Sequence, residues 1–232
     1  MRFVKGFATA IALTLCTTAS AFAQDAAVAV KDGGIFAKGW AGKIDAQEEK
    51  AGQVLNNARL DEKGGVLHVR TGPAVTYWNP ANRAMGSYTV SATFDEAKYM
   101  ELMDHPHPYG IMIAGNDLGT PEQSYVYCSA YGNGTFIVRG MGPGPFQVSA
   151  RKPEPNTAVA KAAGKLSPVK QDIAVTVSGD TIECAINGAV VGTYKKADVV
   201  AAGKLKSTDG VYGVRFAHNT EATVSNLKMT KK

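Results

Sequence analysis

The sequence predicts an all-β fold, a two-sheet antiparallel jelly-roll sandwich with few short helices. Three observations predict it. Short strand-like segments recur from residue 65 to the C-terminus. Gly and Asn residues stand between many of them, as in tight turns. Helical periodicity is scarce, so helices are expected only as short connections.

The N-terminal segment has the pattern of a cleavable signal peptide rather than of a folded element. Arg2 and Lys5 precede a short apolar run over 7–15, and Ala21-Phe22-Ala23 is a small-x-small cleavage site. We therefore expect a signal peptide over 1–23, a single jelly-roll domain over 24–232, and a periplasmic or secreted protein. No later run approaches the roughly 20 apolar residues that a membrane-spanning helix needs.

The charge balance says little about partners. The formal net charge of +5 falls to +3 once Arg2 and Lys5 are removed with the signal peptide. The remaining basic residues are scattered, apart from the Lys231-Lys232 end. This excess is too weak to indicate nucleic acid as a partner, and it is typical of a solvated surface.

The expected elements follow in chain order. Residues 25–58 are rich in Ala and Gly, with Trp40 as an anchor and a short helix within 46–56. Another short helix is expected within 195–201, and the Pro-rich segment 143–155 is expected to be an exposed loop. The predicted strands are 65–70, 87–94, 109–114, 124–131, 135–139, 172–178, 181–187, 189–194, 211–218 and 222–229.

Alternation and turn residues justify these strands. Tyr88, Val90, Ala92 and Phe94 alternate with polar residues, which predicts one buried strand face. The hairpin turns are expected at Gly132-Asn133-Gly134, Gly179-Asp180, Asn187-Gly188 and Asn219-Thr220-Glu221, because Gly and Asn tolerate positive φ.

Two cysteines follow the signal peptide. Cys128 and Cys184 both fall in predicted strands. An oxidising compartment permits a disulfide between them, and two buried free thiols are the alternative.

Three parts of the chain resemble a known superfamily. They are the run Tyr109–Leu118 with 123–127 and 134–139, the pair 173–182 and 186–190, and the closing hairpin 210–219 with 224–227. Together they resemble the concanavalin A-like lectin/glucanase jelly-roll superfamily, most closely its bacterial 3-keto-disaccharide hydrolase-like branch. The resemblance implies a domain that binds a carbohydrate or similar polar ligand, or else a hydrolase or lyase acting on 3-keto-glycosides.

Two aromatic groups are candidates for sugar binding, since sugars stack on aromatic rings while amides and guanidinium groups hold their hydroxyls. Alternation places Tyr125 and Tyr127 on one strand face, which is either an open platform or part of the core. The candidate ligand-binding residues are Tyr77, Trp78, Asn79, Arg83, Tyr125, Tyr127 and Tyr131.

The segment His105-Pro-His-Pro108 supplies the candidate catalytic or metal-binding residues. In an extended segment, His105 and His107 point the same way, and His218 approaches them if the last hairpin lies nearby. Imidazole is a common ligand of divalent metals, the only cofactor these residues suggest. The alternative is a rigid loop that leads into the next strand.

Catalysis of the glucanase type is disfavoured. That branch carries two glutamates in the spacing Glu-x-Asp-x-x-Glu, and neither Asp95-Glu96 nor Glu101 fits it. The sequence therefore favours a binding protein, with an enzyme of oxidised sugars and a non-catalytic envelope protein as alternatives.

Overall fold

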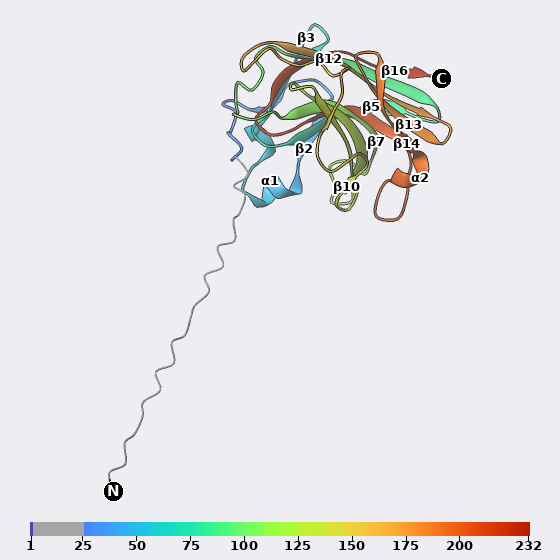
Figure 1. Ribbon diagram of the computed structural model, residues 1–232, viewed down its shortest axis with the longest axis horizontal. Coiled ribbons are helices and arrows are strands. Elements are labelled where there is room, and N and C mark those ends of the chain that lie inside the picture. The colour runs from blue at the N-terminus through green and yellow to red at the C-terminus, as the bar shows by residue number, and fades with distance from the viewer. Residues whose placement is uncertain (2–25) are drawn as a thin grey trace.

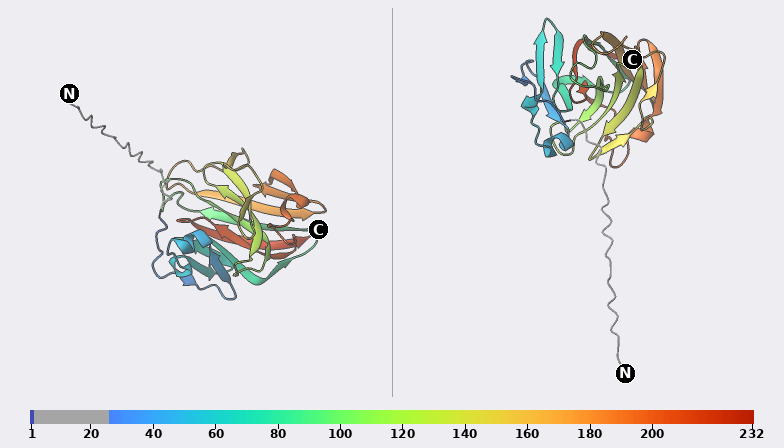
Figure 2. Two further views of the ribbon diagram at one scale, coloured as in Figure 1. Left: turned by 90° about the horizontal axis from the view of Figure 1, so that it is seen from below. Right: turned by 60° about the vertical axis from the view of Figure 1, so that its left-hand side comes forward.

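The computed structural model describes Met1 and residues 26–232. Apart from Met1, the predicted signal peptide and its cleavage site lie outside the described residues. Within that range the chain forms two curved, stacked sheets, with α1 beside β2 and α2 beside β14 (Figure 1). Figure 2 shows the same two layers from two other directions.

The first sheet is antiparallel apart from its β1–β3 edge pair, which is parallel. Its order is β1 (Gly34–Ile35), β3 (Arg59–Lys63), β4 (Val66–Arg70), β16 (Glu221–Lys231), β6 (Tyr88–Glu96), β12 (Val169–Ser178), β13 (Thr181–Ile186) and β14 (Ala189–Lys195).

The second sheet is antiparallel throughout its described pairs. Its order is β10 (Pro145–Gln147), β9 (Thr135–Met141), β8 (Ser124–Tyr131), β7 (Pro108–Asn116), β15 (Gly210–Phe216), β5 (Val75–Ala84) and β2 (Ala41–Ile44), with β11 (Glu154–Pro155) also paired to β9. The helices are α1 (Ala46–Lys50), α2 (Lys196–Val199) and the 3-10 turn η1 (Leu55–Asn57).

The core lies between the sheets and consists of alternate residues from both. From β6 it takes the predicted face, including Tyr88, Val90 and Phe94. From β8 it takes Val126 and Cys128, so that the tyrosines of this strand face away from the opposite sheet. Burial of these apolar side chains is the main stabilising term of the fold.

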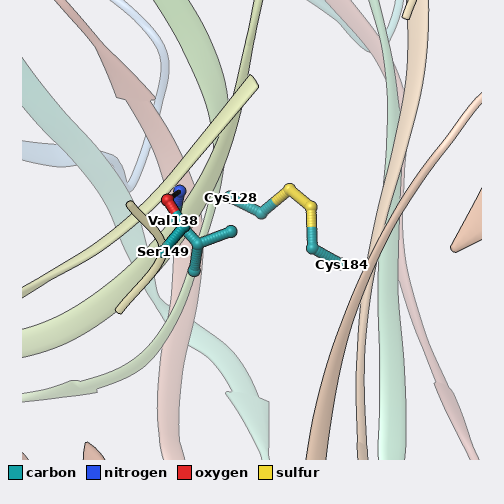
Figure 3. The surroundings of a disulfide bond; sticks show 4 residues. All are labelled: Cys128, Val138, Ser149 and Cys184. Carbon is teal, nitrogen blue, oxygen red and sulfur yellow. Dashed lines mark hydrogen bonds between the residues drawn. A yellow bond between two sulfur atoms is a disulfide. The ribbon is translucent and has the colours of Figure 1, made fainter. Parts of the chain in front are cut away.

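A disulfide joins the two sheets through the core. Cys128 of β8 and Cys184 of β13 are both buried, with their Cα atoms 6.0 Å apart (Figure 3). Beside it, Ser149 Oγ accepts a hydrogen bond from Val138 N at 3.0 Å and holds the edge of the sheet. Of the two alternatives for the cysteines, the structure has the disulfide.

The fold class and most strands are confirmed, including 124–131 with its predicted bounds. Asn187 and Gly188 form a turn with φ values of 50° and 83°, the left-handed conformation that these residues tolerate best. Most of segment 143–155 is exposed, as predicted, but it is not only a loop, since the short strands β10 and β11 pair with β9 there. Among the described residues, no helix is long and apolar enough to cross a bilayer.

Candidate functional site

The outer face of the second sheet collects aromatic and polar side chains. Alternation along β8 turns Tyr125, Tyr127 and Ser129 outward, while Val126 and Cys128 enter the core. The neighbouring strands contribute Arg139, opposite Tyr127, and Arg215, opposite Gly110. We call Tyr125, Tyr127, Ser129, Arg139 and Arg215 the Tyr127 face.

Gly110 is essential to this arrangement. A Cβ atom there would lie 1.9 Å from the carbonyl oxygen of Cys128 and 2.7 Å from Ser129 Oγ. Only glycine therefore lets β7 pass between Arg215 and Ser129 on this face.

Arg215 is a buried cation at the floor of the Tyr127 face. Its side chain is 9% exposed and forms an ion pair with Asp45, which precedes α1. Its guanidinium lies 5.6 Å from the ring centroid of Tyr127. Burial lowers the pKa of Arg215, because it disfavours the charged guanidinium. Asp45 and the adjacent tyrosines raise the pKa by more, so the net shift is upward. The arginine stays charged.

Three donors on this face are buried and make no hydrogen bond to any other described residue. They are Arg215 Nη1, Arg139 Nε and Ser129 Oγ. Another nitrogen of Arg139 donates to the carbonyl of Arg151 at 2.9 Å, which fixes the guanidinium. A buried donor without a partner costs roughly 1–3 kcal/mol, so the face is suited to a ligand or solvent rich in acceptor oxygens.

The predicted aromatic residues divide between the two faces. Tyr77 does not belong to the outer face, because alternation along β5 points it into the core beside its outward neighbour Trp78. Trp78 itself packs against Met112, Tyr125 and Leu118 and is only 6% exposed. Tyr125 faces outward but is fully buried.

The other four predicted residues are more accessible. Tyr127 and Tyr131 are half-buried on the outer face. Asn79 and Arg83 lie farther along β5, where Asn79 Oδ1 accepts a hydrogen bond from Ala81 N at 3.0 Å and Arg83 is exposed. The predicted set therefore forms no single open platform, and only Tyr127 and Tyr131 have the accessibility that ring stacking requires.

The three predicted histidines do converge. His107 and His218 have ring centroids 4.0 Å apart, and His105 and His107 have ring centroids 4.5 Å apart. One ring nitrogen of each lies within 4.8 Å of those of the other two. We call His105, His107 and His218 the histidine cluster.

Glu96 is a buried carboxyl group that sequence reasoning missed. It lies at the end of β6, 5% exposed, in a pocket that His105, His107 and Met103 also line. Burial raises the pKa of Glu96 to about 7, against a hydrogen bond from the Met100 N–H at 3.2 Å. The same alternation that buries Phe94 could have identified it.

Replacing Glu96 with Gln should change how stability depends on pH. The pKa of the Glu96 carboxyl group is about 7 in the folded protein and about 4.5 in the unfolded chain, so the folded state holds the proton more tightly. The free energy of unfolding should therefore fall by roughly 3 kcal/mol as the pH rises from 4.5 to 8, and this fall should vanish in Glu96→Gln. Denaturant unfolding at several pH values measures it. Exposed Glu101 is the matched control, and equal pH profiles for native protein and Glu96→Gln would contradict the prediction.

Among the solved structures that resemble the fold are two with low sequence identity to this chain. The carbohydrate-binding module CBM66 from Bacillus subtilis matches with a TM-score of 0.56 and 7% identity, over 86% of this chain and 99% of that one. A protein of unknown function with a galectin-like fold, also from Bacillus subtilis, matches with a TM-score of 0.54 and 13% identity. The match covers 83% of this chain and 89% of that one. No protein-family model and no curated protein sequence matches the chain. The chain thus shares the two-sheet antiparallel jelly-roll fold of these structures.

Proposed function

We propose that this protein binds a carbohydrate on the Tyr127 face, after export to the periplasm or the cell exterior. The observation that carries the proposal is the group of buried donors on that face that lack partners among the described residues, arranged around a half-buried tyrosine ring. The likeness to a carbohydrate-binding module supports it at the level of the fold.

The side chains indicate how a sugar would be held. The ring of Tyr127 offers an apolar surface for the C–H face of a sugar. Arg139 Nε, Arg215 Nη1 and Ser129 Oγ would donate to its oxygens. Because two of these donors are guanidinium groups, which pair well with carboxylates, we expect a preference for sugars that carry a carboxylate.

Calorimetric titration with a panel of neutral and acidic oligosaccharides tests the proposal. We expect saturable binding, with an affinity that falls about tenfold in Tyr127→Ala, the loss expected for a stacked ring. Tyr194→Ala is the matched control, because that tyrosine is also half-buried but lies on β14 of the opposite sheet. The proposal is wrong if no saccharide binds, or if the two variants lose affinity equally.

A second candidate, an enzyme acting on 3-keto-glycosides, is favoured by one observation. A carboxyl group with a pKa of about 7 shares a pocket with two histidines, as a general base near neutral pH would. Such a base would remove the proton from a carbon next to the ketone. Turnover of a 3-keto-glycoside that is lost in Glu96→Gln would favour this candidate over simple binding.

A further inference from the structure

The histidine cluster is assembled by the ends of two paired strands. His105 and His107 precede β7, and His218 follows β15. These strands are antiparallel neighbours, and Ala217 N donates to the carbonyl of Pro108 at 3.0 Å, which brings the two ends together. Asn219, with a φ of 49°, then reverses the chain directly after His218.

The nitrogen spacing suits a small transition-metal ion. Nε2 of His107 lies 2.7 Å from Nε2 of His105, and one ring nitrogen from each of the three residues falls within 4.8 Å of the others. Zinc binds imidazole nitrogens at about 2.0–2.1 Å in a tetrahedron, which places ligand atoms roughly 3.3 Å apart. The observed nitrogen separations, from 2.7 Å to at most 4.8 Å, lie on both sides of that value.

A hydrogen-bond acceptor determines which nitrogen of His107 faces the cluster, and a carboxylate lies near one nitrogen of His218. The carbonyl oxygen of His218 lies 2.5 Å from Nδ1 of His107 and can only accept, so Nδ1 carries the hydrogen and Nε2 presents its lone pair. A carboxylate oxygen of Glu48 lies 3.7 Å from Nδ1 of His218. A backbone carbonyl and a carboxylate are the usual partners of metal-binding histidines.

Glu48 is itself held in place. Its side chain is 12% exposed, and the same Oε1 atom accepts a hydrogen bond from Ala74 N at 3.2 Å. It therefore lies beside His218 and is not one of the cluster's candidate ligands. Asp104, the nearest acidic residue along the chain, is exposed and paired with Lys165 at 2.5 Å.

We propose that His105, His107 and His218 bind one divalent transition-metal ion, which we expect to be Zn²⁺. The fourth coordination position is left to solvent or a small ligand. Three neutral imidazoles suit zinc, cobalt, nickel and copper, whereas calcium and magnesium prefer oxygen ligands. Sites with three protein ligands and an open position are those that act on a bound molecule. The proposal does not depend on carbohydrate binding at the Tyr127 face.

Metal titration of the purified exported chain tests the site. After chelator treatment and dialysis, we expect zinc to be retained at one ion per chain and to raise the melting temperature. Co²⁺ should give the visible absorption of a tetrahedral site. His105→Ala is the first variant, because this exposed residue can be replaced with little effect on folding.

Two further variants sharpen the test. Glu48→Gln keeps all three imidazoles but replaces the carboxylate near His218 with a neutral amide, and it should weaken zinc binding about tenfold, the lower end of the usual effect of changing such a partner. His68→Ala is the matched control, since it removes the only other histidine, which is exposed on β4 of the first sheet. The proposal fails if native protein retains no zinc, or if His105→Ala binds it as well as His68→Ala does.

Discussion

Replacing Cys128 and Cys184 together with Ala should lower the free energy of unfolding by about 4 kcal/mol. The two cysteines are 56 residues apart in sequence, so the disulfide restricts a long loop of the unfolded chain. It also connects β8 to β13, strands in opposite sheets that share no backbone hydrogen bonds. Chemical denaturation of the native and double-variant proteins, monitored by circular dichroism, measures the difference in the free energy of unfolding.

The same measurement with a reductant separates the two effects of that double substitution. Cys→Ala removes the bond and also leaves a small space in the core, because both side chains are buried. Adding reductant during unfolding of the native protein removes only the bond, and the denaturation midpoint should still move most of the way toward that of the variant. A midpoint that does not respond to reductant would contradict the role given to the disulfide.

Replacing Asp45 with Ala should destabilise the protein by about 3 kcal/mol, because it leaves the cation of Arg215 buried without its counter-charge. The carboxylate is 24% exposed, which places the effect at the lower end of the range for buried pairs. Asp45 makes no side-chain capping bond to α1, so the variant removes no capping bond. Urea denaturation measures the change.

Two variants serve as controls for Asp45→Ala. Glu49→Ala removes another carboxylate from the same segment, but its pair with Lys43 is 3.5 Å long and Glu49 is 48% exposed, so the loss should be less than about 0.5 kcal/mol. Adding Arg215→Met to Asp45→Ala should restore much of the stability, because the buried charge is gone. Equal losses in Asp45→Ala and Glu49→Ala would show that the pair contributes no more than a surface pair.

Local sequence patterns were sufficient for most strands but not for β5. This strand spans Val75–Ala84 and contains Pro80, which lacks the N–H that a central strand donates. Pro80 is tolerated because the pairing with β15 shifts register in that region and β2 begins, at Ala41, opposite Trp78. Which neighbours a strand has is a property of the whole fold, and local sequence does not show it.

The candidate sites were predictable to different degrees. The rigid His105-Pro-His-Pro108 segment and the last hairpin indicated three histidines, and pairing of β7 with β15 brings them together. Glu96 was missed although it lies on the alternating face that buries Phe94. Arg215 was missed because its ion-pair partner, Asp45, is far away in sequence. Tyr77 was predicted to bind the ligand but points into the core, and no strand was expected there whose alternation would have indicated this.

The five-residue helix α1 is a shared support for both sites. Asp45, just before it, contacts Arg215 beneath the Tyr127 face, and Glu48, within it, lies behind His218. A displacement of this single helical turn would alter both contacts at once. Energetic communication between the two surfaces therefore has a short physical route, and thermodynamic linkage requires any such influence to act equally in both directions.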